Sequence, residues 1–274
     1  MTERPTRPLP HVAHRKGGTA SAVRIVPEEI PVAFSYGGTT HAVMMATPAD
    51  MEDFAVGFSL SEGIIEKASD IKEIAVEDHD QGIDIQITLA GNKRDALTAR
   101  RRHMAGPVGC GLCGIESIEQ ALKPVASVEP EGMRLTAGDI VQSVKLLSSM
   151  QPLHTETGAV HAAGFYIAGK GIVAAREDVG RHNALDKLAG ALARQEIEVP
   201  SGAVVVTSRV SIEMVQKTAI IGAPVLIAVS APTALAIRTA EAAGITLVAL
   251  VRGDEFDIYT HTDRIEIGRT AHVA

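Results

Sequence analysis

Alternating hydrophobic and polar positions dominate the first third of the chain and predict strands there. Apolar residues at every second position favour strands over residues 71–76 and 83–89. Two further runs flank Gly37–Gly38 and predict a β-hairpin over residues 31–45. The sequence Thr47-Pro48-Ala49-Asp50 is typical of a helix start, with Thr47 as N-cap, and predicts a helix over residues 51–61. This region is therefore expected to be α+β.

The second half has a different hydrophobic pattern, in which segments of helical periodicity alternate with short Val- and Ile-rich runs. This βαβ alternation predicts a largely parallel sheet covered by helices. We therefore expect an α/β protein made of a flexible tail (residues 1–20), an α+β N-terminal domain (21–123) and a C-terminal α/β domain (135–274). The predicted strands cover 161–168, 172–176, 203–207, 225–229 and 246–251, and the predicted helices cover 137–150, 181–194, 211–221 and 233–243.

Composition narrows the class of protein. Hydrophobic residues make up 46% and charged residues 22%, which favours a packed core over disorder. A net charge of −7, no Trp and only three Tyr and five Phe argue against nucleic-acid binding through bulk charge or base stacking. The first residues lack an apolar signal region, and Gly and Pro interrupt the uncharged stretch 218–237. We expect a cytoplasmic protein that does not span a membrane.

The only two cysteines, Cys110 and Cys113, lie three positions apart in a glycine-rich segment, Gly109-Cys-Gly-Leu-Cys-Gly114. Glycines leave the sulfurs accessible, and the upstream run Arg100-Arg101-Arg102 would favour the reactive thiolate. A reactive or sulfur-carrying thiol, half of a zinc site, a thioredoxin-like dithiol and a pair of buried structural cysteines all remain open at this point. The arginines themselves fit either an anion-binding role or a solvated helix face.

Polar residues gather where predicted strands end. His161 begins a strand and suits a general acid/base, a ligand or a structural hydrogen bond to a carbonyl. Arg181 and His182 lie at a strand-to-helix junction, and Ser208 and Arg209 lie at the next one. Proteins of the α/β class bind ligands at the carboxyl ends of their strands, and helix N-termini favour anions. These junctions therefore suggest a nucleotide-like ligand, although no Walker or G-x-G-x-x-G motif is present.

Together these segments resemble the formate dehydrogenase accessory sulfurtransferase family, FdhD. The matching segments run from about residue 30 to residue 261. They are Phe58-Ser-Leu-Ser-Glu-Gly-Ile-Ile65, Gly109-Cys-Gly-Leu-Cys-Gly114, His161-Ala-Ala163, Glu177-Asp-Val-Gly-Arg-His182, Ala184-Leu-Asp-Lys187, Ser208-Arg209, Glu213-Met-Val-Gln-Lys217 and Tyr259-Thr-His261.

The resemblance implies a sulfur carrier that works with two partners, a cysteine desulfurase and formate dehydrogenase. Sulfur would pass as a persulfide on Cys110, with Cys113 beside it, to the molybdenum of a bis(molybdopterin guanine dinucleotide) cofactor bound as substrate. It also implies a cytidine-deaminase-like three-layer C-terminal domain, a homodimer and a site that a GDP-like nucleotide can occupy. The family's cofactor-binding segment falls on Leu250, Val251, Arg252, Gly253, Asp254 and Glu255.

Two other functions remain as alternatives. A cofactor-binding chaperone would use the thiols only to hold its ligand. A zinc hydrolase or deaminase would need further ligands and a proton shuttle, and Ala163 stands two residues after His161 where deaminases carry Glu. We therefore expect no bound metal.

Overall fold

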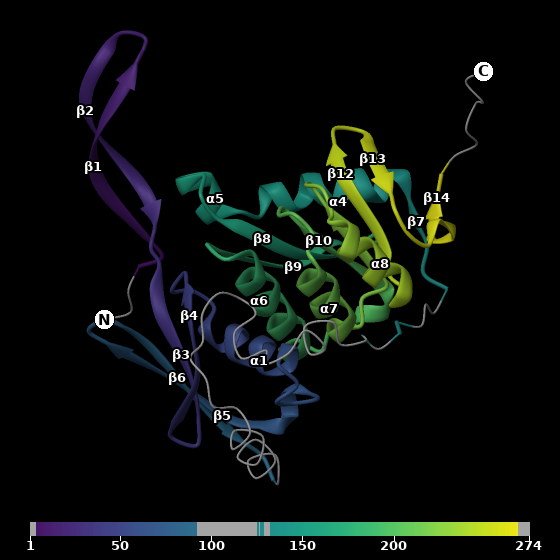
Figure 1. The fold of residues 1–274 in the computed structure, drawn as a ribbon, viewed down its shortest axis with the longest axis horizontal. Coiled ribbons are helices and arrows are strands. Elements are labelled where there is room, and N and C mark those ends of the chain that lie inside the picture. The colour runs from purple at the N-terminus through teal and green to yellow at the C-terminus, as the bar shows by residue number, and fades with distance from the viewer. Residues whose placement is uncertain (1–3, 92–124, 126, 129–131, 268–274) are drawn as a thin grey trace.

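The computed structural model describes residues 4–91, 125, 127–128 and 132–267, and these form stacked layers of sheets and helices (Figure 1). The N-terminal elements are β1 (Thr6–Arg15), β2 (Gly18–Pro27), β3 (Ile30–Tyr36), β4 (Thr39–Ala46), α1 (Met51–Ser61), β5 (Ile71–His79) and β6 (Gly82–Leu89). The C-terminal elements are β7 (Leu135–Thr136), α4 (Ala137–Ser149), α5 (Pro152–Thr157), β8 (His161–Ile167), β9 (Gly171–Asp178), α6 (Arg181–Arg194), β10 (Gly202–Val206), α7 (Ile212–Ile221), β11 (Val225–Ala228), α8 (Ala234–Ala242), β12 (Thr246–Arg252), β13 (Glu255–Ile258) and β14 (Ile265–Glu266). Short 3₁₀ turns lie at Ala68–Asp70, Val199–Ser201 and Thr262–Arg264.

The first two strands form a long antiparallel hairpin that projects from the rest of the molecule (Figure 1). Ten residue pairs join β1 to β2, from Thr6↔Pro27 to Arg15↔Gly18 at the turn. The prediction of a flexible tail over residues 1–20 is therefore wrong. Its prolines and basic residues suggested a tail, but Pro8 and Pro10 fit an edge strand because proline has no N–H to donate to a partner.

A four-stranded sheet with the order β4-β3-β6-β5 follows, and α1 packs on one face of it. Phe34 of β3 stacks on Phe58 of α1, with 4.1 Å between ring centroids. The predicted hairpin and helix are confirmed, but Thr47 is not the N-cap of α1. Asp50 takes that position, with a left-handed φ of 56° and no side-chain capping hydrogen bond. Thr47 instead forms hydrogen bonds with residues of the C-terminal half.

The C-terminal half contains a six-stranded sheet with the order β13-β12-β11-β10-β8-β9. Only the β10–β11 and β11–β12 pairs are parallel, so the prediction of a largely parallel sheet is wrong. Helical crossovers follow β9, β10 and β11, but β8 lies between β9 and β10 and runs antiparallel to both. Strands β8 and β9 are joined by the short turn Gly169–Lys170–Gly171, and a short turn of this kind makes neighbouring strands antiparallel.

Helices cover both faces of this sheet, which gives three layers. Alternate residues of each strand point to opposite faces, so Val204 and Val206 pack toward α6, α7 and α8, whereas Ala203 and Val205 pack toward α4. The predicted fold class, an α/β protein with a three-layer C-terminal domain, is confirmed. In the part of the chain that the structure describes, no helix is long and apolar enough to cross a membrane.

The two halves meet where α1 crosses α6 (Figure 1). Glycines allow this close approach. A Cβ atom at Gly57 would lie 1.7 Å from the carbonyl oxygen of Asp186, and one at Gly190 would lie 1.8 Å from that of Asp53. The backbones of the two helices therefore touch, and α6 is held between the sheet behind it and α1 in front.

Candidate functional site

One edge of the six-stranded sheet collects the ends of five strands. His161 at the start of β8 pairs with Asp178 at the end of β9, and Ala163 pairs with Val206 at the end of β10. Strands β11 and β12 run parallel to β10 and end at the same edge. Helices α6, α7 and α8 begin there, so three helix N-termini, which favour negative charge, lie along this edge.

The structure brings the sequence-predicted site residues to this sheet edge. His161 begins β8, Arg181 and His182 open α6, and Ser208 and Arg209 follow β10. The side chain of Ser208 is buried and donates to the carbonyl of Arg209, at 3.1 Å, so it stabilises the loop between β10 and α7. Arg209 is exposed.

The segment Leu250–Glu255 also lies at this edge, around the turn between β12 and β13. The register shifts between Ala249 and Arg252, and Leu250 has a left-handed φ of 57°, which is costly for a residue with a side chain. Val251 is buried in the core on the α4 side, so only its backbone is available to a ligand. Arg252, Gly253, Asp254 and Glu255 are exposed, and Asp254 lies 3.5 Å from Lys145 of α4.

Two side-chain nitrogens at the start of α6 have no hydrogen-bond partner among the described residues. They are Nε of Arg181 and Nε2 of His182, and both atoms are buried. Burial, followed by the charges of Arg181 and Lys217, lowers the pKa of His182. Burial and the nearby Arg181 likewise lower the pKa of His161. Both imidazoles therefore favour the neutral form, and the positive charge at the edge comes from its arginines.

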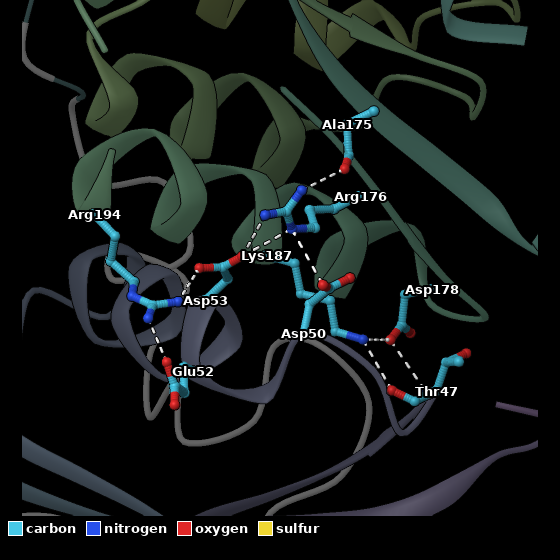
Figure 2. Close-up of polar contacts among 9 residues, drawn as sticks. All are labelled: Thr47, Asp50, Glu52, Asp53, Ala175, Arg176, Asp178, Lys187 and Arg194. Atoms are coloured by element: carbon cyan, nitrogen blue, oxygen red, sulfur yellow. Dashed lines mark hydrogen bonds and ion pairs between the residues drawn. The ribbon is translucent and has the colours of Figure 1, made fainter. Parts of the chain in front are cut away.

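A buried carboxylate beneath these residues fixes the junction between β9 and α6. Asp178 has no exposed side-chain surface and forms a 2.6 Å ion pair with Lys187, which is equally buried. It also accepts hydrogen bonds from Gly180 N, Asn183 Nδ2 and Thr47 N. Lys187 in turn donates to the carbonyl of Thr47 (Figure 2). Asp178 thereby ties the start of α6 to the segment that precedes α1.

A second group of charges joins the two halves beside this pair (Figure 2). Asp53 of α1 accepts from Arg176 of β9 at 2.6 and 2.8 Å and from Arg194 at the end of α6 at 2.5 Å. Arg194 also contacts Glu52. These contacts tie the first turn of α1 to β9 and to the end of α6, so the position of the sheet edge depends on the N-terminal half.

A third contact joins α1, α6 and α7. Asp186 accepts from Ser61 Oγ at 2.6 Å and pairs with Lys217 Nζ at 2.6 Å, and its side chain is buried. Sequence reasoning placed Asp186 and Lys187 in a polar segment at a strand-to-helix junction and singled out Lys217 only as part of a resemblance. It missed the contact roles of Thr47 and Asp53, because residues more than 120 positions apart in the chain carry no local signal of their pairing.

Several predicted residues fall outside the described ranges. These are the two cysteines Cys110 and Cys113 and the arginine run 100–102, so their roles stay predictions. Within the described ranges, no three His, Cys, Asp or Glu side chains are grouped as a metal site would require.

Comparison with known proteins gives consistent matches along the chain. The model of the FdhD/NarQ family matches residues 27–266. The sulfur carrier protein FdhD of Agrobacterium fabrum is 61% identical over 259 residues, which cover 94% of this chain and 96% of that protein. The protein of the same name from Cupriavidus necator is 51% identical over 92% of this chain and 87% of its own length.

A solved structure has a similar fold. It is described as a formate dehydrogenase accessory protein from Desulfotalea psychrophila, with a TM-score of 0.74 and 27% identity over 95% of this chain and 99% of that one. Because the family model covers most of the chain, and relatives above 50% identity cover nearly all of it, this protein belongs to the FdhD/NarQ family.

Proposed function

We propose that the protein is a cytoplasmic sulfur carrier that serves formate dehydrogenase. The observation that carries this proposal is the 61% identity, over 94% of the chain, to a protein named as a sulfur carrier. The chain contains the thiol pair that such chemistry needs, Cys110-Gly-Leu-Cys113. On this proposal it acts as a sulfurtransferase.

Sulfur enters as a persulfide. The thiolate of Cys110 attacks the outer sulfur of a persulfide on a cysteine desulfurase. A new S–S bond forms on Cys110 as the S–S bond of the donor breaks, and the desulfurase thiolate leaves. Cys113, three residues further along the chain, would shield this persulfide or resolve it. The S–S bond on Cys110 then breaks, Cys110 leaves as its thiolate, and the outer sulfur goes to molybdenum in the substrate, the bis(molybdopterin guanine dinucleotide) cofactor. The reduced metal would supply the two electrons that convert this sulfur to a sulfide ligand.

The sheet edge is the candidate cofactor site. Such a cofactor carries two pyrophosphates, and the edge offers three helix N-termini and the exposed guanidinium groups of Arg209 and Arg252. The buried nitrogens Arg181 Nε, a donor, and His182 Nε2 lack partners among the described residues, so phosphate or guanine groups could satisfy them. The carboxylates of Asp254 and Glu255 lie on the same turn and restrict where phosphates can bind.

A GDP titration by calorimetry tests the site. Arg181→Ala should weaken GDP binding at least about tenfold, because it removes a charge-assisted contact. Lys170→Ala is the matched control, since Lys170 is exposed in the turn at the opposite end of β8. Equal GDP affinity in both variants would move the nucleotide site elsewhere.

The alternative is a cofactor-binding chaperone without persulfide chemistry, which the same anion-receptive edge would suit. Activation of formate dehydrogenase by the purified protein separates the two. A carrier loses activation in Cys110→Ala while retaining GDP binding, whereas a chaperone keeps both.

Size-exclusion chromatography with light scattering tests the homodimer that the family resemblance implies.

A further inference from the structure

The β1–β2 hairpin has no role in the sulfur-carrier proposal, yet it is a long structure with little support. Two-stranded hairpins are only marginally stable in water. Val12 and Val23 of this one are each 68% exposed. Among helices, its main contact is with α5, where Arg24 donates to the carbonyl of Thr157 at 3.1 Å. A structure of this kind gains stability when another chain pairs with it.

The two edges of the hairpin differ. In an antiparallel hairpin, residue pairs alternate between those whose backbone groups bond the partner strand and those whose backbone groups point away from it. Proline has no N–H to donate, and Pro8, Pro10 and Pro27 all belong to the outward-pointing pairs. On β1 this removes the outward donors at positions 8 and 10. On β2 the residues of that class are Thr19, Ser21, Val23, Ile25 and Pro27, and only the last, at the end of the strand, lacks an N–H. The outer edge of β2 therefore offers a continuous ladder of donors from Thr19 to Ile25, whereas that of β1 is interrupted at positions 8 and 10.

A groove of about 520 Å³ runs along that edge, between β2 and the C-terminal end of α5. The consecutive residues Ala22–Ile25 line it, which places the backbone edge of β2 along its wall. The cations Arg15 and Arg24 also line it with His11 and His154, against a single carboxylate, Glu156. Nδ1 of His11 is buried and has no hydrogen-bond partner among the described residues.

Charge and strand geometry together specify the occupant. Residues 4–27 contain Arg4, Arg7, Arg15, Lys16 and Arg24 and no Asp or Glu, in a chain whose net charge is −7. Because side chains alternate along a strand, His11, Arg15 and Arg24 share one face of the hairpin, and Pro10, Val12 and Val23 share the other. A third strand would place its acidic side chains on the first face and its apolar side chains on the second.

We propose that the groove between β2 and α5 binds an extended acidic segment of a partner protein, which adds as a third strand to the free edge of β2. Strand addition uses main-chain hydrogen bonds for affinity and alternate side chains for specificity. A peptide fits better than a polyphosphate or a nucleic acid, because the edge presents carbonyl acceptors as well as N–H donors. The inference stands apart from sulfur transfer and does not depend on Cys110.

The test uses the full chain and a fluorescein-labelled ten-residue peptide of alternating glutamate and valine, with binding followed by fluorescence anisotropy. We expect this peptide to bind, and we expect a lysine–valine peptide, or a glutamate–valine peptide N-methylated at alternate residues, not to bind. No binding of the first peptide, or equal binding of the N-methylated one, would overturn the proposal.

Matched variants locate the contact. Ser21 and Val12 are cross-strand partners on opposite edges. Ser21→Pro removes an outward donor from β2 and should weaken binding about tenfold, whereas Val12→Pro removes the equivalent donor from β1 and should change it less than about twofold. Equal losses in the two variants would overturn the proposal, since they would show that only hairpin stability matters.

Charge is tested in the same way at the tip of the hairpin. Arg15 lines the groove, and Lys16 follows it in the turn. Arg15→Glu should weaken peptide binding at least about tenfold, and Lys16→Glu much less. Hydrogen exchange supplies an independent readout, because the bound peptide should protect the amides of Ser21 and Val23. A single-stranded RNA probe that binds the hairpin equally well in Ser21→Pro, without such protection, would mark a phosphate-binding surface instead and overturn strand addition.

Discussion

Replacing Lys187 by Met should strongly destabilise the protein, although it exchanges a charged residue for an apolar one of similar length in a dry interior. The reason is the partner that remains. Lys187 and Asp178 are both fully buried, 2.6 Å apart, and the substitution leaves the Asp178 carboxylate without its countercharge.

The expected cost follows from this burial. Removing one member of a buried ion pair costs about 3–5 kcal/mol. Three neutral donors to Asp178 remain, from Gly180 N, Asn183 Nδ2 and Thr47 N, and they place the cost at the lower end of that range. For a chain of this size, a loss of about 3 kcal/mol lowers Tm by roughly 6–12 °C.

Differential scanning calorimetry measures this, with Lys145→Met as the matched control. Lys145 lies 3.5 Å from Asp254 in an exposed pair, and such pairs contribute at most about 1 kcal/mol, so its Tm should change little. The double variant Lys187→Met/Asp178→Asn removes both charges and should be more stable than Lys187→Met alone. Equal Tm values for Lys187→Met and Lys145→Met would refute the view that this pair holds the β9–α6 junction.

Two other substitutions test the packing and the electrostatics of the site. Gly57→Ala should cost about 3 kcal/mol of unfolding free energy, because its Cβ would overlap the carbonyl of Asp186. Gly138→Ala, whose Cβ would lie 3.5 Å from its nearest neighbour, should be neutral or slightly stabilising. Equal effects of the two substitutions in urea unfolding would contradict the helix crossing. Because burial lowers the pKa of His161 and of His182 in the folded state, the unfolded chain takes up protons first as the pH falls below about 6.5, and Tm should decrease from pH 7.5 to 5.5. His182→Gln should flatten this dependence in a scanning-fluorimetry pH series, and an unchanged slope would show that His182 is not held neutral.

Local patterns predicted most of the fold. The helices over 51–61 and 181–194 have the predicted bounds, because their apolar periodicity and the residues that end them lie within the segments themselves. The order of the strands in the sheets was harder to predict from the sequence. The β8–β9 pair follows from its short glycine-containing turn, but which strand lies on the other side of β8 depends on long-range packing, and the Val- and Ile-rich runs look the same in either case. The hairpin at residues 6–27 was missed because its prolines and charges lie on exposed edges.

As with the fold, only part of the candidate site could be predicted from the sequence. Strand ends at Arg181 and Ser208 mark a sheet edge from sequence alone, since parallel strands bring their ends together. The carboxylates that hold this edge from below were not predictable. Asp53 and Asp178 act through residues of the other half of the chain, and only the crossing of α1 and α6 brings them within reach.

The most direct test of the sulfur-carrier proposal is the intact mass of the purified protein after incubation with an active cysteine desulfurase and cysteine. A wild-type adduct of about 32 Da, one sulfur atom, that a reductant removes and that Cys110→Ala abolishes is the predicted result. The same adduct on Cys110→Ala, or none on the wild type while the desulfurase turns over, would contradict persulfide transfer through Cys110.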